Sequence, residues 1–320
     1  MTRVLVTGAT GFVGANLCAC LAEARCLVRA ALRTPGTPPA GVAEVAVVGD
    51  IGSQTDWRAA LDGVDTVIHT AARAHRLANR DPEETYLEVN ARGTLTLARA
   101  AARGGVRRFI YLSSIKVNGE GWVDRPYSAA DDAHPGDAYA RSKWEGEKHL
   151  QEVVEATTLQ GVVVRAPLVY GPKVKGNFLQ LLHWVRAGRP VPLGGVANAR
   201  SLVSVWNLCD LLRVAIEHPT APGGPWLVSD GEDLSTPELV RRIARAMERP
   251  LILPRVPTPL LRLAGALTGR GAQVSRLCDS LTVDMSATRS RLGWSPPMDV
   301  NEALERTVRW YLSGGAALRA

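Results

Sequence analysis

Short apolar runs alternate with segments of helical periodicity along the first half of the chain. Each run is too short for a helix and is bounded by turn-forming residues, which is typical of a buried strand. Helical patterns begin near Phe12, recur at 57–61 and 90–102, and return around Tyr139. This order predicts an α/β fold with a doubly wound parallel sheet. The apolar runs lie at 4–6, 28–32, 45–48, 66–69, 109–113 and 162–165.

The regular alternation ends after Pro167, where the chain becomes rich in proline and arginine. A chain of 320 residues is long enough for one large or two modest domains. We expect residues 1–166 to form the sheet domain and residues 167–320 to form mainly a smaller, interleaved substrate-binding domain. Apolar runs near 202–205 and 226–228 are expected to return to the large sheet.

The composition, with 46% hydrophobic and 22% charged residues, is ordinary for a globular protein. Met1 is followed by an apolar run without the zones of a signal peptide, so a cytoplasmic location is expected. The best apolar stretch, at 260–267, is interrupted by Arg262 and predicts at most an amphipathic surface helix. We therefore expect no membrane span.

Cysteines, histidines and charge give no sign of a metal or of nucleic acid. The five cysteines are odd in number and the six histidines are scattered, so neither set shows a metal-ligand spacing. The net charge of +7 comes from dispersed arginines rather than from a basic stripe interleaved with aromatic residues. An anionic small molecule is the better partner for this charge.

A glycine-rich segment, VLVTGATGFVG at 4–14, directly follows the first predicted strand and opens a helix. A tight strand-to-helix turn could explain the glycines, but their place at the start of an alternating β/α chain favours a dinucleotide site. Glycines there let backbone amides and a helix N-terminus approach a pyrophosphate. The expected cofactor contacts are Gly8, Thr10, Gly11, Phe12, Val13 and Gly14.

The residues that follow the next strands indicate which dinucleotide binds. An acidic residue that would hold a ribose hydroxyl of NAD is replaced by Arg33, and a basic group suits a 2′-phosphate. Arg33 therefore favours NADP(H) over NAD(H), with a solvated strand end as the alternative. Four further cofactor contacts are expected at carboxyl ends of strands, namely Asp50, Ile51, Ala71 and Ala72.

Three residues form the candidate catalytic set. Tyr139 and Lys143 are one helical turn apart, and Ser114 ends a strand that opens on the same crevice. The Lys143 ammonium is expected to lower the pKa of the Tyr139 phenol from its usual value of about 10. Tyr139 could then exchange a proton with a sugar or alcohol oxygen while Ser114 binds that oxygen. The plainer alternative is a half-buried tyrosine beside a solvated lysine.

These motifs together resemble the extended short-chain dehydrogenase/reductase family, and within it the UDP-glucose 4-epimerase-like epimerase/dehydratase group acting on nucleotide sugars. The resemblance implies an NAD(P)-binding Rossmann fold and Ser114, Tyr139 and Lys143 as catalytic residues, with Lys143 and Asn90 also at the cofactor. It also implies a homodimer through the helices at 90–102 and 139–155. The matching segments are TGATGFVG, GDI, HTAAR, NARGT, SSIKVNG, YARSK, RAPLVYGP and RLGWSP.

The substrate residues follow from the same resemblance. Arg200, in NARSLVSV, matches the family's pyrophosphate arginine, and Arg276 would be a second clamp on the diphosphate of a UDP-sugar. Asn177 resembles a contact near the same phosphates or the sugar. The alternative is that the two arginines form surface ion pairs.

Departures from the family pattern narrow the range of reactions that the chain could catalyse. The 4,6-dehydratases carry an Asp-Glu pair where this chain has Ile115 and Lys116, so dehydration is disfavoured. SSIKVNG is closer to bacterial UDP-quinovosamine-type 4-ketoreductases of surface-polysaccharide synthesis. Because Arg33 suggests exchangeable NADPH whereas an epimerase retains oxidised NAD, we expect a 4-ketoreductase, with a UDP-sugar 4-epimerase as the alternative. A non-catalytic NAD(P)-binding regulator, or a reductase of a non-nucleotide ketone, is a further possibility.

Overall fold

The computed structural model describes residues 1–73, 82–120 and 125–315. Across these ranges, seven strands form a parallel sheet in the order β3-β2-β1-β4-β5-β6-β9, which confirms the predicted doubly wound α/β fold. The order reverses between β1 and β4, so the crevice for a ligand is expected at the carboxyl ends of these two strands. The strands are β1 (Arg3–Thr7), β2 (Leu27–Leu32), β3 (Glu44–Val47), β4 (Thr66–His69), β5 (Arg108–Ser114), β6 (Gln160–Ala166) and β9 (Trp226–Leu227).

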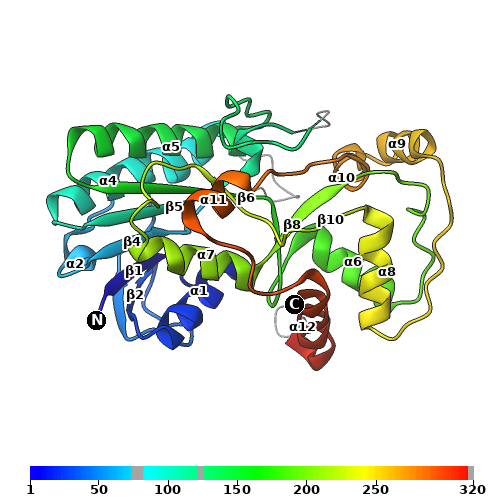
Figure 1. Ribbon diagram of the computed structural model, residues 1–320, viewed down its shortest axis with the longest axis horizontal. Helices are drawn as coiled ribbons and strands as arrows, with labels where there is room; N and C mark the ends of the chain where they lie inside the picture. Colours follow the sequence, from blue (N-terminus) through cyan, green and yellow to red (C-terminus); the bar gives the residue numbers. More distant parts are fainter. Residues whose placement is uncertain (74–81, 121–124, 316–320) are drawn as a thin grey trace.

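Helices cover both faces of this sheet (Figure 1). On one face α1 (Phe12–Glu23) packs on α7 (Val205–Glu217), and the two share a core with the inner sides of the strands. The other face is covered by α2 (Arg58–Leu61), α4 (Gly93–Arg103) and α5 (Ala138–Ala156). Because both faces are buried, the strands are apolar throughout, as the sequence pattern requires.

Short helical turns lead into the long helices of the second face. The chain passes through α3 (Glu83–Tyr86) and the π-turn η1 (Leu87–Arg92) before α4, and through the 3-10 turn η2 (Ile115–Val117) after β5. A Cβ at Gly146 of α5 would lie 2.6 Å from the Asn90 carbonyl oxygen, so glycine is what lets α5 approach η1 so closely.

A smaller lobe is built around a second sheet. The strands β7 (Leu168–Tyr170) and β8 (Arg200–Ser204) pair in parallel, and β10 (Asp233–Leu234) pairs antiparallel with β8. A separate core fills this lobe. Its helical elements are α6 (Gly176–Arg186), α8 (Thr236–Ala246), α9 (Thr258–Leu267), α10 (Gly271–Cys278), α12 (Val300–Trp310) and η3 (Tyr311–Gly315), while α11 (Ser286–Leu292) lies against β9.

Only one of the two apolar runs that were expected to return to the large sheet does so, and the prediction for the other is wrong. Trp226–Leu227 does join the large sheet, pairing with Val164 and Arg165 of β6. The run at 202–205 instead ends β8 of the small sheet and starts α7. Pro167 explains the change of sheet, because a residue without an amide hydrogen ends the hydrogen-bond ladder of β6 before β7 begins. The domain boundary after residue 166 lies beside this proline and stays a prediction.

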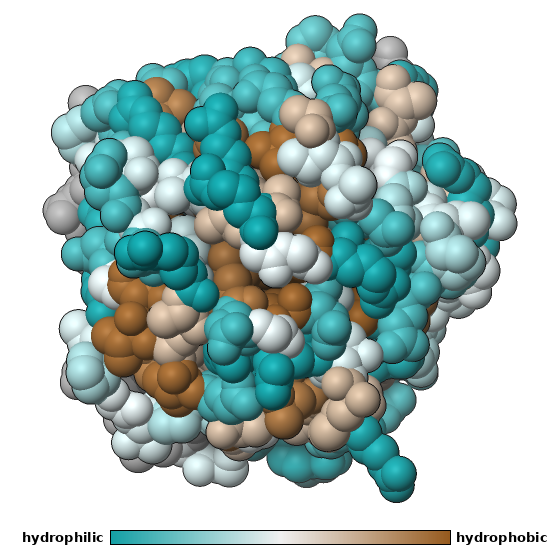
Figure 2. All heavy atoms as spheres, turned by 90° about the vertical axis from the view of Figure 1, so that its left-hand side faces the viewer, coloured by the Kyte–Doolittle hydropathy of each residue, from teal (hydrophilic) through white to brown (hydrophobic). Residues whose placement is uncertain are grey.

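The surface of the large lobe is mixed in character. Figure 2 shows the end of the molecule at the left of Figure 1, where hydrophobic patches are interspersed with hydrophilic side chains. Within the described ranges, no helix combines the length and the apolar character that crossing a membrane requires.

Candidate active site

The glycine-rich turn forms a cradle without side chains between β1 and α1. Gly8 has a φ of +68°, and a Cβ there would lie 2.7 Å from the Ala71 nitrogen. The Gly11 amide donates to the Gly8 carbonyl at 2.8 Å, and α1 begins at Phe12 without a side-chain cap. Amides of an uncapped first turn are ready to bind an anion. These observations fit the pyrophosphate of a dinucleotide.

The other residues of this segment are placed differently. Thr10 is exposed, whereas the half-buried side chains of Phe12 and Val13 pack against the hydrophobic cores. Only the backbone of these two residues could therefore serve a cofactor. Gly14 lies one turn into α1, where its lack of a side chain lets the helix approach the Gly8–Ala9 backbone.

Thr7 ties the end of β1 to the segment after β4. Its hydroxyl lies 2.6 Å from Nδ1 of His69 and accepts from the Ala71 amide at 3.3 Å. The Thr70 hydroxyl donates to the Thr7 carbonyl at 2.7 Å. These bonds hold Ala71 beside Gly8 at the point where the strand order reverses, and Ala72 follows as an exposed residue. Both alanines therefore lie at the expected crevice.

Arg33 and Asp50 form an exposed ion pair at the carboxyl ends of β2 and β3. Nε of Arg33 lies 2.8 Å from Oδ1 of Asp50, and the side chains are 74% and 84% exposed. The two candidate cofactor residues are thus adjacent, but the arginine is occupied by a carboxylate. Ile51, the next residue, packs against the core under α4 and is close to Gly93.

Asn90 lies in η1 and is fully buried, with protein partners for its amide. Its Oδ1 accepts from the Arg73 amide at 2.7 Å, and its Nδ2 donates to the Arg73 carbonyl and to the Ser142 hydroxyl. The Ser142 hydroxyl in turn donates to the Tyr139 carbonyl at 2.7 Å. Asn90 therefore joins the segment after β4 to the helix that carries Tyr139.

Ser114 and Tyr139 are brought together as predicted. Ser114 ends β5, caps η2 and is 9% exposed. Its side chain lies close enough to the Tyr139 phenol to lower the pKa of that phenol. Burial is the larger effect, however, and together with the negative charge of Asp137 it raises the pKa of Tyr139 to about 12. The phenol is therefore protonated at neutral pH.

The expected effect of Lys143 on Tyr139 is wrong for this structure. Lys143 is 1% exposed, and its ammonium lies over the Tyr111 ring, 4.0 Å from the centroid. Burial lowers the pKa of Lys143 to about 7, while the carboxylate of Glu147 raises it. Spacing in the sequence placed the two residues on one helix but could not show that burial dominates both of their pKa values.

Two arginines of the smaller lobe act on Lys116, a cation at the same edge of the large lobe. Burial lowers the pKa of Lys116, and the charges of Arg276 and Arg200 lower it further. Nζ of Lys116 is held by Asp137 at 2.8 Å and by Glu120. The structure thus brings Arg200 and Arg276 near Lys116, which lies two positions after Ser114.

The predicted substrate residues lie on three elements of the small lobe. Arg200 starts β8, and its Nη1 donates to the Asp279 carbonyl at 2.8 Å. Burial and the charge of Arg276, in α10, lower the pKa of Arg200. Asn177, in α6, has a buried Oδ1 without a hydrogen-bond partner among the described residues. The two guanidinium groups suit an anionic ligand, whereas Oδ1 of Asn177 would accept a hydrogen bond from a hydroxyl group.

The sequence interpretation gave no role to several buried residues behind this edge. His69 stacks on Tyr111 with ring centroids 5.6 Å apart, and burial followed by the charge of Lys143 lowers its pKa to about 3. Glu147 and Arg165 form a buried ion pair. In the sequence these residues were recognisable as polar residues at core positions of predicted strands and helices, where a polar group is costly unless it has a partner.

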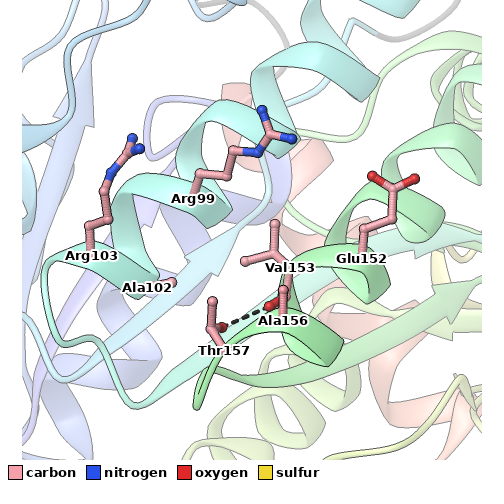
Figure 3. A pocket seen from close by; sticks show the side chains of 7 residues that line it. All are labelled: Arg99, Ala102, Arg103, Glu152, Val153, Ala156 and Thr157. Atoms are coloured by element: carbon pink, nitrogen blue, oxygen red, sulfur yellow. Dashed lines mark hydrogen bonds between the residues drawn. The ribbon is translucent and has the colours of Figure 1, made fainter.

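Two surface grooves lie away from this edge. Figure 3 shows a groove of about 360 Å³ between α4 and α5, with Arg99 and Arg103 on one side and Glu152 on the other. A second groove of about 310 Å³ is lined by Glu83, Leu87, Ala91, Arg92, Arg141, Glu145 and His149. Neither contains a predicted catalytic or substrate residue. The described part of the chain has no group of three or more potential metal ligands.

Comparison with known proteins gives a consistent result. A UDP-glucose 4-epimerase of Vibrio cholerae is 42% identical over 314 residues, covering 97% of this chain and 95% of the relative. The structure of UDP-glucuronic acid 4-epimerase from Bacillus cereus in complex with NAD superposes with a TM-score of 0.78 at 19% identity, covering 98% and 99% of the two chains.

A UDP-glucose 4-epimerase from Thermotoga maritima, solved with UDP-glucose, superposes with a TM-score of 0.76 at 20% identity over 98% and 99% of the chains. These structural similarities bear on the fold. The model of the NAD dependent epimerase/dehydratase family matches residues 4–228. This chain belongs to that family and is an NAD-dependent enzyme.

Proposed function

We propose that the chain transfers hydride at C4 of a UDP-linked hexose and acts as a UDP-sugar 4-epimerase. The observation that carries this proposal is the closeness of Ser114 and Tyr139 at the crevice, where the serine side chain acts on the pKa of the phenol. A buried lysine lies one turn further along the same helix. The similarity to a UDP-glucose 4-epimerase over nearly the full length supports the epimerase over the expected ketoreductase.

In this mechanism Tyr139 exchanges a proton with the C4 oxygen of the sugar while Ser114 hydrogen-bonds to that oxygen. Bound NAD supplies the hydride acceptor and donor. A phenol with a pKa of about 12 is suited to donate the proton to a 4-ketone, and taking it from an alcohol requires added positive charge near Tyr139. The charge of Lys143 does not lower the Tyr139 pKa in this structure, so we propose Lys143, as the family resemblance implies, as a contact of the nicotinamide ribose.

Epimerisation also requires the sugar to present both faces while the nucleotide stays bound. The clustered charges of Arg200 and Arg276 would hold the diphosphate and leave the sugar free to turn. Dehydration is disfavoured, because Ile115 is apolar and Lys116 is already bound by Asp137 and Glu120.

We propose NAD rather than NADP as the cofactor. A 2′-phosphate would have to compete with the Asp50 carboxylate for Arg33 and would itself be repelled by that carboxylate. The presence of Arg33 still favours a second candidate function, an NADPH-dependent 4-ketoreductase acting on a UDP-4-keto-deoxyhexose.

A homodimer through the exposed faces of α4 and α5 is proposed from the family resemblance. The groove between these helices carries Arg99 and Arg103 opposite Glu152, and complementary charges of this kind can pair across a two-fold axis. This arrangement of charges supports the proposed homodimer, and it does not depend on which residues are catalytic.

The purified protein is expected to interconvert UDP-glucose and UDP-galactose without added cofactor, as followed by proton NMR of the anomeric signals. Tyr139→Phe should lower the rate by about 10²-fold or more, because the proton-transfer group is lost. Tyr311→Phe removes a phenol bound to His183 in the small lobe and serves as the matched control. Oxidation of NADPH by a UDP-4-keto-6-deoxyhexosamine without any interconversion would instead establish the second candidate.

Arg276→Gln should raise the melting temperature of the ligand-free protein by a few degrees and reduce its thermal protection by UDP. The reason is that Arg276 and Arg200 repel each other until a diphosphate lies between them. Arg245→Gln, on an exposed position of α8, is the control. If UDP protects Arg276→Gln against thermal unfolding as well as it protects the wild-type protein, Arg276 does not bind the diphosphate.

Light scattering should give a molar mass of about twice 34.3 kDa for the wild-type chain. Replacing Arg99 and Arg103 together by glutamate should give the monomer mass, because like charges would then face Glu152 at the contact. A monomeric wild-type protein contradicts the proposal, and so does a dimer that survives the double substitution.

A further inference from the structure

A buried ion pair lies directly behind the reactive edge. Glu147 of α5 and Arg165 of β6 have side chains that are 6% and 4% exposed. Nε and Nη2 of Arg165 donate to the carboxylate at 3.0 Å and 2.6 Å. Such a pair is weak evidence for stability, since desolvating two charges offsets much of their attraction. Its contacts therefore invite a functional explanation.

The pair holds the chain on both sides of Ser114. The Ser113 hydroxyl donates to Oε1 of Glu147, and Nη1 of Arg165 donates to Oδ1 of Asn118 at 3.0 Å. Asn118 ends η2, the turn that Ser114 caps, and donates to the Ser128 carbonyl. The residue before Ser114 and the turn after it are thus bound to one buried pair of charges.

The same carboxylate lies one helical turn after Lys143. Tyr139 and Glu147 lie one helical turn to either side of Lys143 on α5, the ammonium lies over the Tyr111 ring of β5, and His69 of β4 senses its charge. His69 is neutral, because its pKa is about 3, and both phenols have raised pKa values. Among these groups in the described structure, Glu147 alone carries a negative charge at neutral pH.

We propose that Glu147 is a positioning residue: with Arg165 it fixes Ser114 at the sheet edge, and its carboxylate stabilises the buried ammonium of Lys143 one helical turn away. The catalytic consequence rests on the proposed function. The electrostatic part is a property of the folded chain and can be measured without turnover.

The sequence contains only five lysines, Lys116, Lys143, Lys148, Lys173 and Lys175, so each can be followed by NMR of protein labelled with 13C at lysine Cε. Lys143→Arg assigns the signal of Lys143. In Glu147→Gln the midpoint of its titration should move to lower pH, because the carboxylate that raises the pKa of Lys143 is gone. An unchanged or higher midpoint would overturn the proposal.

Two further variants separate charge from folding. Glu145→Gln changes an exposed carboxylate on the same helix that binds Lys148, and it should leave the Lys143 midpoint unchanged. If Glu147→Gln alone fails to fold, the double variant Glu147→Gln with Arg165→Met removes both buried charges at once, a change that proteins tolerate better. The Lys143 midpoint should fall in that variant also.

In the holoenzyme the alkaline limb of the kcat profile should move to lower pH in Glu147→Gln. Lys143 loses its proton as the pH rises through its pKa. Since that pKa is lower in Glu147→Gln, the activity should fall at a lower pH. Glu147→Asp should restore part of the shift. A wild-type enzyme without turnover would refute the proposed function but not the NMR result, whereas turnover with an unshifted limb would refute the role of Glu147.

A second inference comes from α9, at the far edge of the small lobe (Figure 1). Leu260, Leu263 and Leu267 recur along this helix at helical spacing and are 55%, 56% and 80% exposed. Ile252 nearby is 57% exposed. Large apolar side chains gathered on one exposed helix indicate a surface that is covered in the working protein.

The charge around this apolar surface is mainly positive, with Asp279 as an acidic residue at its border. Residues 249–278 contain five arginines and no acidic residue. Arg262 pairs with Asp279, whereas the exposed Arg255 and Arg270 have no side-chain partner within the described structure. A second copy of the same positive surface would be repelled. An apolar stripe flanked by arginines instead matches a bilayer with anionic headgroups.

We infer that α9 docks the small lobe on an anionic lipid surface. Since α10, which carries Arg276, packs against α9, docking would place the proposed diphosphate site beside the membrane. The inference does not depend on the reaction that the site catalyses.

Sedimentation with phosphatidylglycerol–phosphatidylcholine vesicles tests it. The wild-type protein should bind these vesicles and not pure phosphatidylcholine. Replacing Leu263 and Leu267 by glutamine should weaken binding by about tenfold or more. The same change at Val45 and Val47, which are exposed on β3, is the control. Absence of vesicle binding, equal binding by the variant, or a lower molar mass of the variant, which would indicate self-association, each contradicts the inference.

Discussion

The burial of Lys143 is the constraint on which the reactive edge depends. An ammonium between α5 and the sheet loses its hydration, and burial alone would bring its pKa well below the ordinary value. The protein offsets this loss with the face of the Tyr111 ring and the carboxylate of Glu147. Glu147 is itself buried and requires Arg165, so a single interior lysine accounts for a network across α5, β5 and β6.

Much of the fold follows from local patterns. Parallel strands covered on both faces must be apolar, and the glycines of the first turn mark the place where β1 and α1 approach each other. These features identified the large sheet, the cradle at Gly8 and the pairing of Ser114 with Tyr139. The sheet and the cradle follow from a repeating pattern and from residues close in sequence, whereas Ser114 and Tyr139 were linked by a strand end and a helix that open on the same crevice.

The parts that could not be predicted depend on burial and on partners distant in sequence. The raised pKa of Tyr139 comes from its surroundings and from Asp137, not from the spacing to Lys143. Arg33 is a basic residue at the expected position, but its ion pair with Asp50 becomes visible only when β2 and β3 are aligned. The run at 202–205 has strand character, and its sheet is decided by the departure of the chain at Pro167.

Charges at the crevice are connected in a way that links the two lobes. Asp137 caps α5, binds Lys116, and raises the pKa of Tyr139 two residues later. Lys116 in turn senses the charges of Arg200 and Arg276. An anion bound between the arginines would reduce their repulsion of Lys116 and so strengthen its charge beside Asp137. Binding in the small lobe would thereby act on the electrostatic surroundings of Tyr139, without requiring any movement of the sheet.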